Sequence, residues 1–269
     1  MYISTNMGKM EISLSPTEQK IYSRLYPKRV ITTENVVQIL GDLHKSADYI
    51  TNLRRKGFFQ KIRRGVYAIV PPDMIGKKYY PDKFLIASNI KKDYYLSYHS
   101  ALELHGLAES VFNTVYISLR DYLQPFEYQD ITYDFVSTKY FFGMDEIYYK
   151  STKVMVSDIE KTVLDCIRRI EYAGGLEELW KSMSSIPSFN YDKVWDYLKK
   201  FNEGILYHKT GFLFESLPEE LTPPNDFVHT LNKKLGKKVY YLDKEKPSVL
   251  NKRWRLMVPT NFEEMIQIA

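Results

Sequence analysis

The chain has 269 residues, of which 44% are hydrophobic and 15% aromatic, enough material to bury one core or two. Its single cysteine, Cys166, excludes an intramolecular disulfide and a cysteine-rich zinc site. No apolar run approaches the roughly 20 residues that span a bilayer, and the N-terminal stretch lacks the apolar run of a signal peptide, so we expect a soluble, cytoplasmic protein without membrane contact.

The formal net charge of +5 is distributed unevenly along the chain. Residues 1–78 contain 14 Lys and Arg against 6 Asp and Glu, a balance of +8, whereas residues 79–269 contain 24 against 27, a balance of −3. Chance scatter also produces such a bias in some chains. The asymmetry nevertheless favours an anionic polymer as the partner of the N-terminal part.

Capping signals predict two short helices near the N-terminus. Ser15, Pro16 and Glu18 supply a capping hydroxyl, a proline at the first helical position and a capping-box carboxylate. This first helix is expected to end near Pro27. The second begins at Thr32 or Thr33 and carries apolar residues at helical spacing up to the stop signal Gly41.

A third helix is predicted after the turn at residues 41–44, with Ser46 as its cap and with Ala47, Ile50 and Leu53 facing inward. Polar side chains recur every three or four residues on its other face and project together. They are Lys45, Tyr49, Asn52 and Lys56, flanked by Ser46 and Arg55. Such groups can contact phosphates and base edges in a major groove.

Two β-prone runs, residues 58–62 and 66–70, then predict a hairpin with Arg63 and Arg64 at its tip and Lys61 on its first strand. Between Lys45 and Arg64 there are seven basic residues and one acidic residue, Asp48. Three helices followed by a basic hairpin are typical of a winged helix-turn-helix. The hypotheses are that this domain, residues 1–78, binds DNA, or that it only docks other proteins.

The remainder, residues 79–269, predicts a larger domain after a proline-containing connector at 71–78. Helices are expected near 81–90, 97–105, 157–170, 175–185, 190–201, 205–217 and 225–235. Strands are expected at 94–96, 114–119, 131–137, 147–156, 239–242 and 253–258. Because strands and helices do not alternate regularly, the predicted fold class is α+β, an N-terminal winged helix-turn-helix followed by a mixed α+β domain.

The sequence contains no nucleotide-binding, nucleophile-elbow or zinc-protease motif, and its five histidines have no ligand spacing. We therefore expect no catalytic residue, no metal and no cofactor. Asp158 and Glu160 are interpreted as charges at a helix N-terminus opened by a second capping box at Ser157. Asp165 needs no more than solvent or an ion pair, and Cys166 is expected to be a small core residue.

Three stretches resemble the AbiEi-type antitoxins of type IV toxin-antitoxin and phage abortive-infection systems. They are Leu53–Phe58 running into Arg63–Ala68, then Tyr98–Leu107 with Val156–Asp165, and finally Asn251–Leu256. The likeness spans nearly the whole chain, and the order and spacing of the stretches are more specific than any one of them. The chain departs from many of these relatives in being rich in lysine and tyrosine rather than arginine.

The resemblance implies a DNA-binding antitoxin and transcriptional autorepressor that is not an enzyme. Its winged helix would bind operator inverted repeats in double-stranded DNA, and its C-terminal domain would counteract a nucleotidyltransferase-type toxin. The groove and wing contacts would be Lys45, Ser46, Tyr49, Asn52, Arg55, Lys56, Lys61, Arg63 and Arg64. Whether the protein is a monomer or a dimer, or dimerises only on DNA, stays open.

Two other hypotheses remain. The first is a free-standing transcriptional regulator whose C-terminal domain senses a ligand or oligomerises, with no toxin beside it. The second is a DNA-processing enzyme with a winged-helix targeting domain, which no paired-carboxylate and lysine pattern favours.

Overall fold

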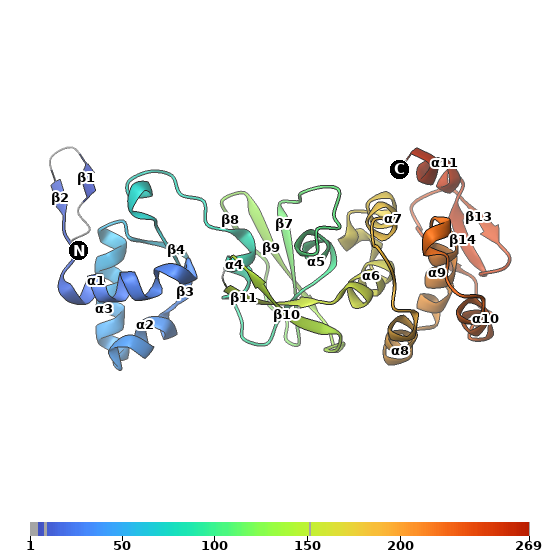
Figure 1. Cartoon of the computed structure of the whole chain (residues 1–269), viewed down its shortest axis with the longest axis horizontal. Helices are drawn as coiled ribbons and strands as arrows, with labels where there is room; N and C mark the ends of the chain where they lie inside the picture. Colours follow the sequence, from blue (N-terminus) through green and yellow to red (C-terminus); the bar gives the residue numbers. More distant parts are fainter. Residues whose placement is uncertain (1–4, 8–9, 151, 269) are drawn as a thin grey trace. The chain divides into compact units, whose positions relative to one another are not determined.

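The computed structural model describes residues 5–7, 10–150 and 152–268 and has a mixed α+β fold (Figure 1). These residues form eleven α-helices and four sheets, of two, six, three and three strands. The α+β class is therefore confirmed. The chain divides into two compact units. The first comprises Met1–Tyr94, Phe126–Tyr133 and Glu146–Val154, and the second comprises Tyr95–Pro125, Asp134–Asp145 and Met155–Ala269.

The first two helices of the first unit form where local capping signals predict them. Helix α1 spans Pro16–Leu25, and its N-cap Ser15 exchanges hydrogen bonds with Glu18: the Ser15 N–H donates to the Glu18 carboxylate at 2.7 Å and the Ser15 hydroxyl accepts from the Glu18 N–H at 3.3 Å. Helix α2 spans Thr33–Leu40 and is closed by Gly41 in the left-handed conformation, with a φ of 71°. Both predictions are confirmed.

The third helix, α3, spans Leu43–Arg55 and begins earlier than expected. Its N-cap is Asp42, whose carboxylate accepts a hydrogen bond from the backbone N–H of Lys45 at 2.9 Å. The prediction of Ser46 as the cap is therefore wrong. An aspartate accepts a backbone N–H as well as a serine does, and here it lies four residues nearer the start of the chain.

A three-stranded antiparallel sheet follows these helices, in the order β3-β5-β4. Strands β4 (Phe59–Arg63) and β5 (Val66–Ile69) confirm the predicted hairpin. Strand β3 (Val30–Thr32), which pairs Val30 with Ala68, was not predicted. Three residues between two helices are too few to show an alternating pattern.

Apolar side chains from all these elements form one buried cluster. The Tyr22 hydroxyl donates to the carbonyl oxygen of Val70 at 2.7 Å, and the Tyr22 ring packs edge-on against Phe58 at 5.1 Å. The other members with almost no exposed surface are Ile21, Ile31, Val36, Leu53 and Ile69. This core fixes α3 against the β4–β5 hairpin.

The six-stranded sheet has the order β10-β11-β6-β7-β9-β8. Its strands are β6 (Tyr95–Leu96), β7 (Thr114–Leu119), β8 (Phe126–Tyr128), β9 (Ile131–Ser137), β10 (Met144–Tyr149) and β11 (Thr152–Ser157). The predicted strands at 114–119 and 131–137 are confirmed. The single strand predicted at 147–156 is wrong, because β10 ends at Tyr149 and Lys150 takes a left-handed φ of 46° before β11 begins.

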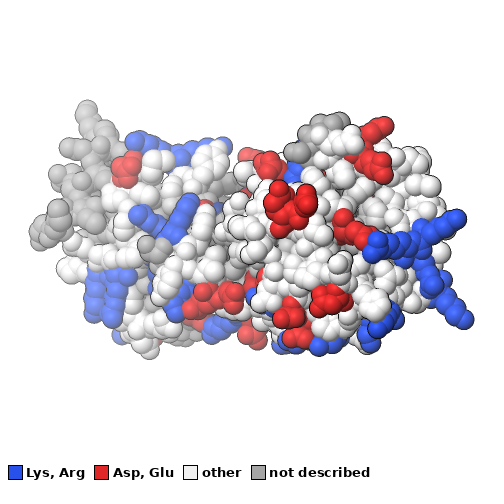
Figure 2. Space-filling view, turned by 45° about the vertical axis from the view of Figure 1, so that its right-hand side comes forward, with Lys and Arg blue, Asp and Glu red and all other residues white. Residues whose placement is uncertain are grey.

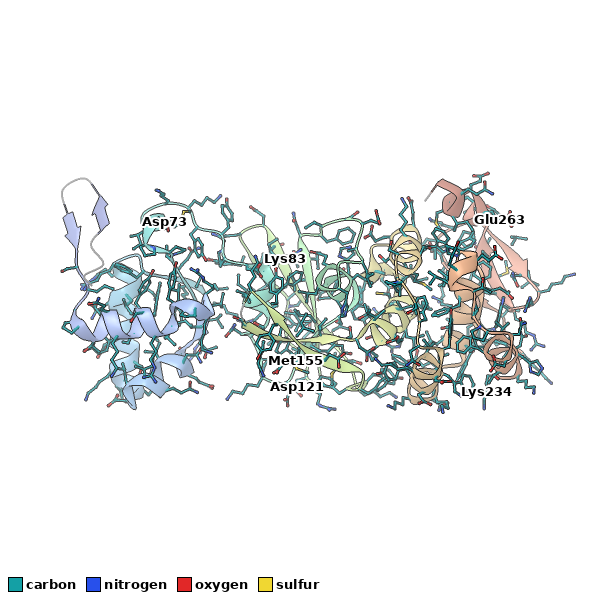
Figure 3. All side chains as sticks on the ribbon, in the orientation of Figure 1. Asp73, Lys83, Asp121, Met155, Lys234 and Glu263 are labelled. Atoms are coloured by element: carbon teal, nitrogen blue, oxygen red, sulfur yellow. The ribbon has the colours of Figure 1, made fainter. Side chains whose placement is uncertain are left out.

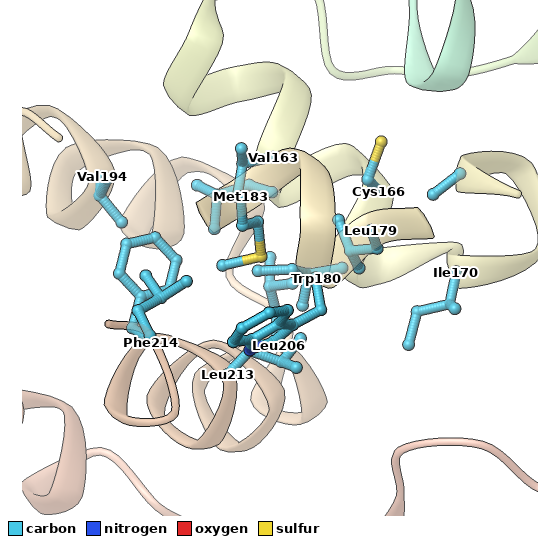
Figure 4. Packing of buried hydrophobic residues seen from close by; sticks show 14 of the residues in the cluster. Val163, Cys166, Ile170, Leu179, Trp180, Met183, Val194, Leu206, Leu213 and Phe214 are labelled. Atoms are coloured by element: carbon cyan, nitrogen blue, oxygen red, sulfur yellow. The ribbon is translucent and has the colours of Figure 1, made fainter. Parts of the chain in front are cut away.

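The helices of the second unit pack around α6 (Ile159–Arg168), whose N-cap is Asp158 rather than the predicted Ser157. The predicted helices near 175–185, 190–201, 205–217 and 225–235 are confirmed. They are α7 (Leu176–Ser184), α8 (Tyr191–Phe201), α9 (Gly204–Glu215) and α10 (Asn225–Lys233). Figure 4 shows Val163 of α6, Leu179 and Met183 of α7, and Phe214 of α9 within one apolar cluster. Cys166 is fully buried beside them, as predicted.

The remaining elements are short. Helices α4 and α5 span Lys83–Ala87 and Tyr98–Leu104, and α11 spans Phe262–Ile268. Strands β12 (Tyr240–Tyr241), β13 (Ser248–Asn251) and β14 (Leu256–Pro259) form a sheet in the order β12-β14-β13, and β1 (Thr5–Met7) pairs with β2 (Met10–Ile12). The 3-10 helices are Tyr26–Lys28, Pro72–Met74, Ile170–Ala173 and Glu219–Leu221.

Candidate nucleic-acid interface

The orientation of α3 decides which of its polar side chains reach solvent. The buried positions are Ser46, Ile50 and Leu53, whereas Ala47, which was predicted to face inward, is exposed. Ile50 and Leu53 are buried as predicted, but the buried position one turn before Ile50 is Ser46 rather than Ala47. The buried stripe therefore turns toward Ser46, and Ala47 joins the exposed face.

Ser46 departs most clearly from its predicted role. Its side chain is fully buried, and its hydroxyl donates to the carbonyl oxygen of Asp42 at 2.6 Å. The hydroxyl is thus hydrogen-bonded to the backbone of the first turn of α3 and does not reach solvent. We leave Ser46 out of the candidate interface.

The other predicted residues of α3 differ in exposure. Lys45 and Arg55 are exposed. Asn52 is half-buried, and its Oδ1 accepts a hydrogen bond from Nη2 of Arg55 at 3.3 Å. Tyr49 is half-buried and packs against the apolar cluster of the first unit, so only part of its ring is open to a partner.

Lys56 forms an ion pair with Glu18 of α1. Its Nζ lies 2.6 Å from Oε2 of Glu18 and donates to the carbonyl oxygen of Ser13 at 3.0 Å, and the Glu18 side chain is only 4% exposed. Burial alone would raise the pKa of Glu18, but the hydrogen bonds from Lys56 and Ser15 lower it below its usual value. Lys56 therefore neutralises a recessed carboxylate.

Replacing Lys56 with alanine is expected to lower the free energy of unfolding by about 1 to 2 kcal/mol, because it leaves the Glu18 carboxylate without its cation. Urea unfolding followed by circular dichroism measures this change. Arg55→Ala, which removes an exposed cation one position away, is the matched control and should leave stability unchanged. Equal stability of the two variants would contradict a structural role for Lys56.

The hairpin places its three basic residues differently. Lys61 and Arg64 are exposed. The guanidinium of Arg63 lies over the Phe126 ring, 4.7 Å from its centroid, and its Nη1 is buried. Arg64 and Lys61 are thus available to an anionic partner, whereas Arg63 is held by an aromatic side chain.

A shallow pocket of about 360 Å³ lies between α3 and β4. Its lining residues are Thr51, Arg54, Arg55, Phe59 and Lys61. Three cations and a hydroxyl thus converge on one concave surface, and two of the cations, Arg55 and Lys61, were predicted. Thr51 and Arg54 were missed, because the predicted contact face followed the stripe of Lys45, Tyr49, Asn52 and Lys56, and both residues project from α3 to one side of it.

Acidic side chains are few on the elements that line this pocket. On the face seen in Figure 2, Asp and Glu gather mainly over the second unit. Among the residues of α3, β4 and β5 the acidic member is Asp48, which is exposed. The pocket between α3 and β4 therefore has the sign of charge that attracts phosphate.

Asp158, Glu160 and Asp165 have partners that explain them without catalysis. Asp158 caps α6 and accepts a hydrogen bond from the Tyr197 hydroxyl at 2.6 Å. The ammonium of Lys193 lies 3.1 Å from both Asp158 and Glu160. Asp165 pairs with Lys161 in the interior of the second unit.

Over residues 5–7, 10–150 and 152–268, no three His, Cys, Asp or Glu side chains gather in an arrangement able to hold a metal ion. Within the same ranges, none of the helices combines the length and apolarity needed to cross a bilayer.

Comparisons with known proteins reveal similarity at the level of fold. No family model matches the chain, and no curated protein sequence matches it. The crystal structure of the RV2827C protein from Mycobacterium tuberculosis is similar, with a TM-score of 0.66, 15% sequence identity and 95% of each chain covered. At this identity the likeness concerns the fold alone: the mixed α+β arrangement extends over nearly the whole length of both proteins.

Proposed function

We propose that residues 15–70 form a winged helix-turn-helix that binds double-stranded DNA, and that the protein is a transcriptional regulator of the AbiEi antitoxin type. The observation that carries the proposal is the cationic pocket lined by Arg54, Arg55 and Lys61 between α3 and β4. Helix α3 supplies one wall and the hairpin strand supplies the other.

The dimensions of α3 support a role in groove recognition. At 1.5 Å per residue its 13 residues extend about 20 Å, and a B-DNA major groove of about 12 Å width admits one helix. A hairpin beside such a helix can reach the adjacent phosphates, and Arg64 stands at its turn.

The side chains divide into two classes of contact. Arg54, Arg55, Lys61, Lys45 and Arg64 would neutralise phosphates, which provides affinity without sequence preference. Thr51 and Asn52 carry the hydroxyl and amide groups that distinguish base edges, so they would contribute preference for the operator.

Fluorescence anisotropy of the protein with the duplex upstream of its own gene, against a scrambled duplex, tests the proposal across a salt series. The double variant Arg54→Ala/Arg55→Ala is expected to bind both duplexes at least about tenfold more weakly. Its plot of log affinity against log salt should be shallower by about 2, because each lost phosphate contact removes about 0.9 from the slope.

The matched control is Arg24→Ala/Lys28→Ala, which removes the same charge from exposed positions at α1 and the 3-10 helix after it. It should bind DNA nearly as the unaltered protein does. Equal weakening in both double variants would mean that net charge rather than this surface binds DNA. Unaltered binding by Arg54→Ala/Arg55→Ala would refute the proposed interface.

The antitoxin part of the proposal rests on the resemblance of Tyr98–Leu107, Val156–Asp165 and Asn251–Leu256. It is tested by growth of cells that express a neighbouring nucleotidyltransferase-type gene with or without this protein. The Arg54→Ala/Arg55→Ala variant should still restore growth, since the second unit is intact. Growth that needs no rescue would favour a free-standing regulator.

A further inference from the structure

A second concave cationic surface lies within the second unit, away from α3 and the hairpin in sequence. It is a pocket of about 480 Å³ lined by Arg120, Ser137, Thr138, Lys139, Tyr140 and Arg168. Three of these six residues are cations and three carry hydroxyl groups. None of them belongs to the proposed DNA interface.

Two hydrogen bonds bring the segments of this pocket together. The N–H of Thr138 donates to the carbonyl oxygen of Leu119 at 2.8 Å, and the Ser137 hydroxyl donates to the carbonyl oxygen of Arg120 at 3.2 Å. The residues that follow β7 and β9 therefore lie side by side. In Figure 3 the label of Asp121, the residue after Arg120, marks this end of the sheet.

Arg168, at the end of α6, is held in a fixed orientation. Its Nε lies 2.9 Å from both carboxylate oxygens of Glu203, and the Tyr140 hydroxyl donates to the same carboxylate at 2.9 Å. The Arg168 side chain is 22% exposed, so it is recessed but still reachable. Among the described residues it is Nε that bonds Glu203, which leaves the two terminal nitrogens of Arg168 to donate to a ligand.

Arg120 and Lys139 have no carboxylate partner among the described residues. The Arg120 guanidinium lies over the Phe141 ring at 4.1 Å, and the Lys139 ammonium lies 5.2 Å from the Tyr140 centroid. Aromatic faces hold these cations near the pocket without neutralising them. With Glu203 offsetting Arg168, two positive charges remain uncompensated.

We propose that this pocket binds a small ligand bearing two adjacent phosphate groups, such as inorganic pyrophosphate or the diphosphate of a nucleotide. Its volume lies within the range of about 300 to 1,000 Å³ that small-molecule sites occupy. Guanidinium groups bind phosphate bidentately, and the Lys139 ammonium adds a further charge-assisted donor. A convex DNA backbone would reach exposed Arg120 and Lys139 but not recessed Arg168, so a small anion fits the pocket better.

Isothermal titration of the full chain with inorganic pyrophosphate, at constant ionic strength and without DNA, tests the site. We expect saturable binding of one pyrophosphate per chain with a Kd below about 1 mM. The variant Arg120→Ala/Lys139→Ala should weaken it at least about tenfold, since two charge-assisted contacts are lost. Both residues are exposed, so the variant is expected to fold, which circular dichroism verifies.

The matched control is Lys237→Ala/Arg253→Ala, which removes one exposed lysine and one exposed arginine of the second unit outside the pocket. Its pyrophosphate affinity should be unchanged. Absence of saturable binding, or an equal loss in both double variants, would overturn the proposal. So would a variant Arg120→Ala/Lys139→Ala that binds pyrophosphate normally but loses affinity for a random-sequence duplex, because the pocket would then be a DNA surface.

Discussion

Replacing Lys161 with methionine is expected to lower the free energy of unfolding by about 3 to 5 kcal/mol, because it leaves a buried carboxylate without its cation. The Lys161 side chain is fully buried and the Asp165 side chain is 3% exposed, and the two form an ion pair one turn apart on α6. The ammonium also lies 3.3 Å from the Tyr95 hydroxyl, to which it donates.

Aromatic rings surround this pair and keep water out. The Lys161 ammonium lies 4.9 Å from the centroid of Phe201 and 5.1 Å from those of Phe142 and Tyr95. Burial lowers the pKa of Lys161 and raises the pKa of Asp165, because an interior site disfavours the ionised form of each group. Lys161 and Asp165 offset each other as an ion pair, so a change that removes one leaves the other buried without that partner.

Urea unfolding monitored by circular dichroism measures the loss. The double variant Lys161→Met/Asp165→Leu should be far less destabilised than the two single variants added together, because it leaves no buried charge. Lys199→Met, which removes the exposed partner of Asp196, should be indistinguishable from the unaltered protein. A Lys161→Met variant as stable as the Lys199→Met variant would show that the pair is dispensable.

This pair also bears on the stretch Val156–Asp165, on which part of the family resemblance rests. Two of its charged residues, Lys161 and Asp165, face the interior of the second unit, and Asp158 caps the helix. Burial of the pair and capping of the helix account for these three residues through the stability of the fold. Under the proposed antitoxin function, contacts with a toxin are expected on exposed surfaces outside this helix face.

Local signals were sufficient to predict much of the fold. The Ser15 capping box, the Gly41 stop and the hairpin at 58–70 each depend on residues within a few positions of one another. Such signals act within one helical turn or one hairpin, so they can be recognised from neighbouring residues without knowledge of tertiary contacts. Strand β3 was missed because it exists only by pairing with β5, more than thirty residues later.

The candidate site was predicted only in part, and α3 shows why. Ser46 and Ala47 are both small, so hydrophobicity cannot decide which one faces the core. Tertiary packing buries Ser46, whose hydroxyl is satisfied by the carbonyl of Asp42, and exposes Ala47. That difference of one position withdraws Ser46 from the interface. Thr51 and Arg54 line the pocket because β4 packs beside their side of α3, which the sequence pattern of the helix does not indicate.

Partners distant in sequence account for the other differences. Lys56 is paired with Glu18, and Arg63 lies over Phe126. The spacing of the residues around Lys56 or Arg63 does not indicate either contact. A sequence pattern can predict which cations occur near a helix or a turn, whereas the fold decides which of them remain available to a ligand.

Replacing Gly211 with alanine is expected to lower the free energy of unfolding by about 2 to 3 kcal/mol, although alanine favours helix by about 1 kcal/mol over glycine. A Cβ atom at Gly211, in the middle of α9, would overlap the six-membered ring of Trp254. Trp254 is fully buried and cannot move aside easily. Its Nε1 donates to Glu215 at 2.7 Å, and its carbonyl oxygen lies 2.7 Å from Nδ1 of His208.

Urea unfolding tests this prediction, with Gly236→Ala as the matched control, since a Cβ there would meet no atom within 4 Å. The control should be neutral or slightly stabilising. Trp254→Phe removes the ring that the new methyl group would strike, so Gly211→Ala/Trp254→Phe should cost less than the sum of its two single changes. Strict additivity would mean that Gly211 is not required for the close approach of α9 to Trp254.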